Sequence, residues 1–290
     1  MAIIDVPEVF KTQDMIYHYC SLNTAIDYIL KIDKNNIEKN NPELRLSTRG
    51  DSNDPIERII PKISTAIAAI SEGDLKRITD LTVEKTARLE RSLKSQFEKA
   101  RQVCFCKNRD KIETIDDYGF LKPRMWDQYA NRYHGVCLAF SKRELLKIEK
   151  INLKDDLKYK IYQELEQYNP QIDCNDVLDD YEKAYQILEK DANEWLFWKH
   201  KDYEGENEYR IYTFAESKYD YINIENCLKG IIYPQEKHCK YFHKLLKEYV
   251  KNTDIKLFDI TWGYNGLTVE KNSTIEGFIR PDYPVCKPSS

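Results

Sequence analysis

The clearest alternation of apolar and polar positions lies in residues 207–214, with the sequence NEYRIYTF. Its isoleucine and aromatic residues favour a half-buried β-strand. Glu206 and Glu208 stand two residues apart at its start, so they share one face of the sheet if both belong to the strand. Arg210 falls on the same face. We therefore expect two carboxylates and one guanidinium to lie side by side.

Two neighbouring carboxylates repel each other unless water, a cation or a shared proton relieves the repulsion. A cation or a shared proton is common at functional sites, and Arg210 is the candidate cation. The structural alternative is a solvent-exposed face on which Arg210 pairs with a glutamate and contributes little to stability. The pattern alone leaves both interpretations open.

Apolar runs elsewhere predict further strands, and a 3.6-residue periodicity predicts helices. The predicted strands are residues 15–20, 44–47, 103–106, 135–140, 228–233, 255–261 and 267–269, and the predicted short helices are residues 21–30, 124–133 and 236–251. Asp54 followed by Pro55 is a helix-start signal. Charged helical insertions are expected at about 55–101 and about 150–200, the second ending in an aromatic cluster at 195–198.

Strands and helices are mixed without a regular βαβ alternation. This arrangement favours the α+β class with a mixed, mostly antiparallel central sheet. The length of 290 residues suits one elaborated domain, which we place at residues 1–280. Residues 281–290 are rich in proline and serine and are predicted to form a loosely ordered tail.

The composition excludes some classes of protein. The chain carries 45 basic and 49 acidic residues and a net charge of −4, so no global positive field favours nucleic-acid binding. No apolar run has the length of a membrane span and the N-terminus lacks the pattern of a secretion signal, so we expect a cytoplasmic protein with no membrane partner. Its eight cysteines include no CxxC pair, which favours reduced, mostly buried thiols.

Common catalytic motifs do not occur in the sequence, which has no GxGxxG, P-loop, HExxH or GxSxG pattern. His238, Cys239 and His243 resemble a metal-binding cluster. Positions five residues apart do not share a helix face, so we expect no metal there.

Three other residues are candidates for a site. His18 ends a predicted strand just before a helix, where functional residues collect, although a strand histidine is more often structural. Tyr129 and Tyr133 lie about one helical turn apart and would flank a cleft. Aromatic residues at helical spacing more often belong to a hydrophobic core, so this alternative stays open.

Several short motifs follow one another along roughly residues 15–270. They are Tyr17-His18-Tyr19, Asn53-Asp54-Pro55-Ile56-Glu57, Cys104-Phe105-Cys106, Met125-Trp126 with Tyr129-Ala130, His134-Gly135-Val136-Cys137-Leu138, and Glu206 with Glu208-Tyr209-Arg210. Their order resembles a bacterial domain-of-unknown-function family, number 2971 (DUF2971). Membership of this family implies no chemistry.

A second resemblance does imply a chemistry. A strand histidine, a mid-chain tyrosine and a late strand glutamate occur in that order at His18, at Tyr129 or Tyr133, and at Glu208. The order resembles the His-Tyr-Glu constellation of ADP-ribosyltransferases. The resemblance implies that His18 holds the ribose beside the nicotinamide of NAD and that one of the tyrosines stacks on the nicotinamide ring. Glu208 would be the catalytic acid, with Glu206 as the first member of a glutamate pair.

The same resemblance implies a split central sheet and places Tyr19 among the cofactor-binding residues. Arg210 would pair with the carboxylates or reach a phosphate, and Arg49 or Arg58 would serve the pyrophosphate. Cleavage of the nicotinamide–ribose bond develops positive charge on the sugar, which a fixed carboxylate stabilises. NAD would then be the substrate, and ADP-ribose would pass to a protein or a nucleic acid, as in a bacterial toxin or an antiphage effector. A homo-oligomer is one option for its assembly.

Two other functions fit the same residues. One is a non-catalytic sensor or interaction module whose pocket binds a nucleotide or a partner. The other is a metal-dependent nuclease that uses Glu206, Glu208 and Asp54.

Overall fold

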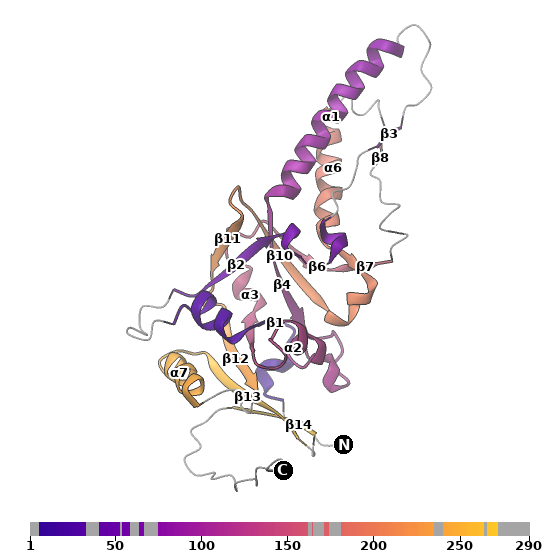
Figure 1. Cartoon of the computed structure of the whole chain (residues 1–290). Helices are drawn as coiled ribbons and strands as arrows, with labels where there is room; N and C mark the ends of the chain where they lie inside the picture. The colour runs from indigo at the N-terminus through magenta and orange to yellow at the C-terminus, as the bar shows by residue number, and fades with distance from the viewer. Residues whose placement is uncertain are drawn as a thin grey trace, which may run out of the picture.

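A mixed, mostly antiparallel sheet forms the centre of the molecule, with helices packed on its faces (Figure 1). The computed structural model describes residues 6–32, 41–52, 54–58, 64–66, 75–161, 164, 171–173, 181–234, 240–263 and 266–271. Eight of the strand pairings in this sheet are antiparallel, and the pairing of β12 with β13 is parallel. The predicted α+β class is therefore confirmed.

The main sheet has ten strands in the described part of the chain. They are β1 (Met15–Cys20), β2 (Glu43–Thr48), β4 (Ala100–Lys107), β5 (Val136–Ser141), β6 (Leu153–Asp156), β10 (Glu208–Phe214), β11 (Tyr219–Asn223), β12 (Leu228–Pro234), β13 (Lys256–Gly263) and β14 (Gly266–Lys271). Two small parallel pairs lie apart from it, β3 (Ser64–Ala66) with β8 (Gln171–Asp173) and β7 (Lys158–Lys160) with β9 (Trp198–His200).

The sheet forks at β4. One edge of β4 pairs with β10 along its length, with Cys106 opposite Glu208. The other edge is shared: Gln102 pairs with Ser47 of β2, whereas Cys106 pairs with Tyr17 of β1. Beyond β2 lies β11, and beyond β1 lie β5, β12, β13 and β14. Two wings of sheet therefore leave the same strand, with a gap between them.

The helices are short except for two. They are α1 (Leu75–Lys99), α2 (Pro123–Gln128), α3 (Lys142–Leu145), α6 (Tyr181–Leu196) and α7 (Lys240–Val250), with 3-10 helices η1 (Glu8–Lys11), η4 (Arg49–Asp51), η5 (Pro55–Arg58), η6 (Ile115–Asp117) and η7 (Lys201–Glu206) and the π-helix η2 (Thr24–Ile29). None of the helices in this described part has the length and apolar character needed to cross a membrane.

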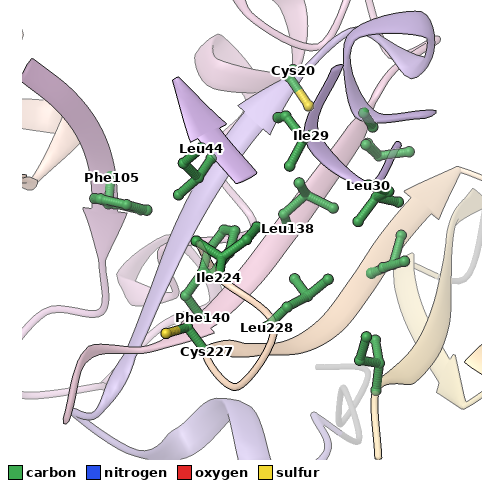
Figure 2. Packing of buried hydrophobic residues seen from close by; sticks show 14 of the residues in the cluster. Cys20, Ile29, Leu30, Leu44, Phe105, Leu138, Phe140, Ile224, Cys227 and Leu228 are labelled. Carbon is green, nitrogen blue, oxygen red and sulfur yellow. The ribbon is translucent and has the colours of Figure 1, made fainter. Parts of the chain in front are cut away.

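One face of the sheet carries the largest hydrophobic cluster (Figure 2). Leu44, Phe105, Leu138 and Phe140 point to this face and pack against η2 and against the turn that precedes β12. They alternate with residues on the opposite face, as the two-residue period of a strand requires. The hydrophobic cluster thus fixes which side chains of β1, β2 and β4 are left to line the other face.

The helices α1 and α6 lie side by side and project from one end of the sheet (Figure 1). Leu93 and Phe97 of α1 pack against Leu188 and Trp195 of α6, and the cluster continues onto Tyr212 of the sheet. The aromatic residues at 195–198, which end the second predicted insertion, thus dock α6 on the sheet.

The two helical insertions begin later than predicted. Pro55 starts only a four-residue 3-10 helix, β3 follows, and α1 begins at Leu75. Residues 153–160 form β6 and β7 instead of helix. Among the described strands β6 pairs only with β10, which makes it an edge strand there, and charged side chains are favoured at an edge and hide the alternation. The predicted tail at 281–290 lies outside the described residues.

Gly135 is required at the joint between α2 and β5. A Cβ atom at this position would lie 2.2 Å from the carbonyl oxygen of Cys20 and 2.8 Å from backbone atoms of Ala130. We expect Gly135→Ala to lower the free energy of unfolding by about 1–3 kcal/mol or more, because backbone atoms cannot move aside easily. Urea unfolding measures this. Gly50→Ala is the matched control, since its added methyl group meets ordinary contacts, and equal loss in both variants would contradict the packing argument.

Candidate functional site

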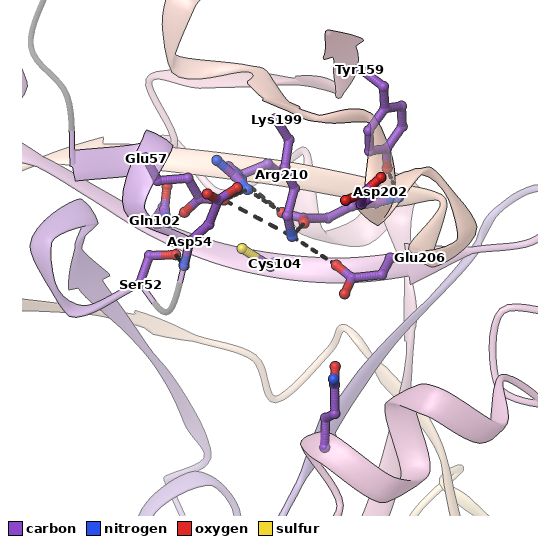
Figure 3. A network of polar contacts seen from close by, with 12 residues as sticks. Ser52, Asp54, Glu57, Gln102, Cys104, Tyr159, Lys199, Asp202, Glu206 and Arg210 are labelled. Carbon is purple, nitrogen blue, oxygen red and sulfur yellow. Dashed lines mark hydrogen bonds and ion pairs between the residues drawn. The ribbon is translucent and has the colours of Figure 1, made fainter. Parts of the chain in front are cut away.

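A buried network of charges joins β9, η7 and β10 (Figure 3). The Nζ atom of Lys199 lies 2.7 Å from Oε2 of Glu206 and 2.7 Å from Oε2 of Glu208. Each of these three side chains is almost fully buried. The ammonium group therefore occupies the place between the two carboxylates that a bound cation would otherwise take.

Arg210 extends the network to a distant part of the chain. Its guanidinium lies 2.7 Å from Oε1 of Glu208 and 2.7 Å from Oε1 of Glu57 in η5. Its Nη1 atom also donates to the hydroxyl of Tyr212 and to the carbonyl of Leu196. The predicted role of Arg210 as the cation beside the carboxylates is confirmed, whereas the exposed alternative is wrong, because Arg210 is fully buried.

Neutral groups add further hydrogen bonds to the network. Gln102 donates to Oε2 of Glu57 and accepts a hydrogen bond from Tyr212. The hydroxyl of Tyr159 accepts a hydrogen bond from the backbone N–H of Glu208. Buried charges persist only when they are paired and hydrogen-bonded in this way.

Glu206 reaches the network from outside the strand. It is the last residue of η7, and Asn207 follows in the left-handed conformation, with φ of 46°. The condition that both glutamates belong to the strand is therefore not met, since β10 begins at Glu208. The turn nevertheless brings both carboxylates to Lys199.

The two glutamates have opposite shifts in pKa. Burial would raise the pKa of Glu208, but Arg210 and Lys199 outweigh it and hold that pKa below its usual range. Burial raises the pKa of Glu206 in spite of the nearby Lys199. Its Oε1 atom has no hydrogen-bond partner among the described residues, and the guanidinium of Arg124 lies 3.8 Å away. Glu206 therefore keeps an oxygen available, whereas both oxygens of Glu208 are engaged.

A cavity of about 1330 Å³ opens beside this network. Glu57, Lys199, Glu206 and Glu208 line one end of it, and Cys104 forms part of its wall. Burial raises the pKa of the Cys104 thiol, which keeps the sulfur protonated and unreactive. The five cysteines that the structure describes are free thiols.

His18 lines the same cavity but belongs to the other face of the sheet. Tyr17, its neighbour, pairs with Cys106 and so shares the face of Glu208, whereas the His18 ring contacts Phe105. Its Nδ1 atom lies 3.0 Å from the carbonyl oxygen of Cys104. A carbonyl only accepts, so Nδ1 carries a proton. Burial lowers the pKa of His18, which leaves Nε2 as an acceptor at neutral pH.

Two of the predicted tyrosines line the cavity and one does not. Tyr19 and Tyr129 are part of its wall, and Tyr129 is partly exposed to it. The ring of Tyr133 stacks on Trp126, and its hydroxyl donates to the carbonyl of Pro123. Three successive left-handed residues, 131–133, turn Tyr133 away from the helical spacing on which its prediction depended.

The candidate phosphate ligands Arg49 and Arg58 are engaged elsewhere. The guanidinium of Arg49 is buried over the ring of Phe97, and Arg58 donates to the carbonyl of Ser52. Asp54 is buried near Glu57 and does not line the cavity.

Sequence reasoning missed Lys199, Glu57 and Gln102 as members of the site. Lys199 follows an aromatic cluster and carries no motif, and Glu57 belongs to the family motif at 53–57, which implies no chemistry. The one available signal was the acidic pair at 206 and 208, which requires more positive charge than Arg210 alone supplies.

Residues 125–211 match the model of a protein family described as protein of unknown function, DUF2971. The chain is similar to DUF2971 over this segment. The predicted resemblance is confirmed over these residues, which contain Lys199, Glu206, Glu208 and Arg210. Glu57 lies before the DUF2971 segment. Comparison with curated proteins and with solved structures found no match.

Lys199 is expected to stabilise the fold because its loss would remove the close counter-ion of the buried Glu206 and leave Glu208 paired with Arg210 alone. Lys199→Met should lower the free energy of unfolding by about 3–5 kcal/mol. Lys158→Met is the control, since Lys158 pairs with Glu194 at 2.8 Å on the surface and should contribute no more than about 1 kcal/mol. If urea unfolding shows that both variants lose a similar free energy of unfolding, the buried lysine has no special role in stability.

Acid should weaken the fold through Glu57. Burial opposes its ionisation, but Arg210 and Lys199 lower its pKa from 4.5 to about 2. A pKa that is lower in the folded state means that the ionised carboxylate adds stability above pH 4.5, which is lost as the pH falls towards 2. Unfolding measured between pH 7 and pH 2.5 should therefore show a flatter acid dependence in Glu57→Gln, whereas the exposed control Glu204→Gln should follow the wild type. An unchanged slope in Glu57→Gln would assign the acid sensitivity to other groups.

Proposed function

We propose that the chain cleaves the nicotinamide–ribose bond of NAD and transfers ADP-ribose to a macromolecular acceptor. The observation that carries the proposal is the convergence of Glu206, Glu208, His18 and Tyr129 on one cavity. At about 1330 Å³ the cavity exceeds the usual size of a site for a drug-sized ligand, which suits a dinucleotide.

The charge of the network supports a cationic group beside it. Among the buried side chains of the network, three carboxylates, Glu57, Glu206 and Glu208, face two cations, Lys199 and Arg210, so one buried negative charge is in excess. The half-exposed Arg124, 3.8 Å from Glu206, balances this charge from the solvent side, where water screens it. The nicotinamide ring of NAD carries a positive charge, and the sugar becomes positive as the bond breaks. A fixed excess of negative charge in a buried site favours both.

The residues of the site then take separate roles. Glu208 is ionised and is held by Arg210 and Lys199, so in this proposal it is a positioning residue that fixes the lysine. Glu206 presents its Oε1 atom without a hydrogen-bond partner among the described residues, so it would approach the sugar or take a proton from the acceptor. The resemblance gave the catalytic role to Glu208, whereas this proposal gives it to Glu206.

The remaining walls suit the other parts of the substrate. Nε2 of His18 can accept a hydrogen bond from a ribose hydroxyl. The ring of Tyr129 offers a flat, partly exposed surface for nicotinamide. Departing nicotinamide takes the electron pair of the broken bond, and the acceptor nucleophile then bonds to the ribose carbon and gives up its proton.

A non-catalytic binding module is a second candidate, because both oxygens of Glu208 are already bound to cations. Such a module would bind NAD without releasing nicotinamide. A metal-dependent nuclease is less favoured, since Lys199 occupies the place between Glu206 and Glu208. Cleavage of nucleic acid that depends on magnesium and on Glu206 would reverse this order.

Release of nicotinamide from NAD tests the proposal directly. We expect the wild type to release it and Glu206→Gln to do so about 100 to 1000 times more slowly, because one preorganised electrostatic contact is lost. Chromatography of the products measures the rate. Glu204→Gln is the matched control, an exposed glutamate on the same 3-10 helix, and should keep the wild-type rate. Full activity in a folded Glu206→Gln variant would remove that residue from the reaction.

A further inference from the structure

The end of the cavity away from the charge network is formed by β2 and β11. Arg45 of β2 lies directly opposite Tyr221 of β11, and the guanidinium carbon of Arg45 lies 4.5 Å from the centre of the Tyr219 ring. All three residues line the cavity. A basic group and two aromatic rings therefore share one wall.

This wall lies on the same face of the sheet as the charge network. Ser47 of β2 pairs with Gln102 of β4, and directly paired residues share a face. Arg45 is two residues from Ser47 and so points to that face, as does Glu208 opposite Cys106. A single ligand on this face can therefore touch both ends.

The distance between the ends follows from the strand register. If the spacing at the paired residues Ser47 and Thr48 continues to Arg45, the Cα atoms of Arg45 and Glu208 are separated by two strand spacings and about two residues along the strands, roughly 12 Å. Two nucleotides joined through a pyrophosphate are long enough to reach both ends.

Exposed tyrosines gather at this cavity. Among the described residues four tyrosines have exposed side chains: Tyr28 at 70%, Tyr129 at 38%, Tyr221 at 45% and Tyr241 at 53%. The first three line the cavity. Aromatic rings left in water beside a cavity are suited to stacking on a flat ligand, and such stacking tolerates any base.

Arg45 is available to an anion. The other two basic residues of the lining are occupied, because Lys31 pairs with Glu43 at 2.5 Å and Lys199 with its glutamates. Arg45 forms no ion pair with the described residues and stacks only on Tyr219. A guanidinium stacked on an aromatic ring keeps its edge free for the forked hydrogen bonds that phosphate accepts.

We propose that Arg45 and Tyr221 form a subsite for the adenosine diphosphate half of the substrate. The base stacks on Tyr221, and Arg45 binds the phosphates. This inference rests on the proposed function, which it deepens by assigning the second half of NAD to the β2–β11 wing. The nicotinamide half then lies at the acidic end, next to Glu206.

Binding of ADP and of ADP-ribose tests the subsite without any reaction, because neither contains nicotinamide. We expect both to bind the wild type and Glu206→Gln alike, as measured by calorimetry. Tyr221→Ala and Arg45→Gln should each weaken binding about tenfold or more. Tyr221→Phe should keep the affinity, since the ring is retained.

Tyr241→Ala and Arg143→Gln are the matched controls, an exposed tyrosine and an exposed arginine outside the cavity, and should bind ADP as the wild type does. The subsite would be overturned if the wild type does not bind ADP. It would also be overturned if Arg45→Gln and Tyr221→Ala bind ADP with the affinity of the wild type. A third contradicting result would be that these variants bind a single-stranded oligonucleotide more weakly than the wild type but bind ADP equally well. The binding experiment requires no bond cleavage, so its result does not depend on whether the protein releases nicotinamide.

Discussion

The ion pairs of Lys199 and Arg210 with three buried carboxylates are the interaction on which the rest of the site depends. Removing charges from water is costly, and the cost is offset only when every partner is in place. Lys199 comes from β9, Arg210 from β10 and Glu57 from a 3-10 helix more than a hundred residues earlier. The network therefore fixes the position of these elements and at the same time sets the protonation of Glu206 and Glu208.

The fork at β4 explains why there is a cavity beside the network. A continuous sheet would pair both edges of β4 along their whole length. Here β2 and β1 each take only part of one edge, and the side chain of His18 supplies a hydrogen bond to the carbonyl of Cys104 between them. The carbonyl of Cys104 at the opening is thus hydrogen-bonded, and side chains from both faces of the sheet line the cavity.

Local patterns predicted the strands and the pairing of Arg210 well, because alternation and like-charge repulsion act over a few residues. The α+β class followed from the same patterns. They could not predict Lys199 or Glu57, whose roles arise only when distant segments meet. The left-handed turns at Asn207 and at residues 131–133 broke the periodicity on which the placements of Glu206 and Tyr133 depended. The charged edge strand β6 was predicted to be helix because it lacks the buried alternation that marks a strand.

The order of these parts along the chain bears on how the protein matures on the ribosome. Strand β4 is synthesised before its partner β10, which ends at Phe214, and both Lys199 and Arg210 must be made before Glu57 has its counter-ions. A nascent chain shorter than this keeps one edge of β4 bare and its acidic groups in water. Any chemistry that needs the assembled charges therefore cannot begin until the chain has been synthesised at least as far as Arg210.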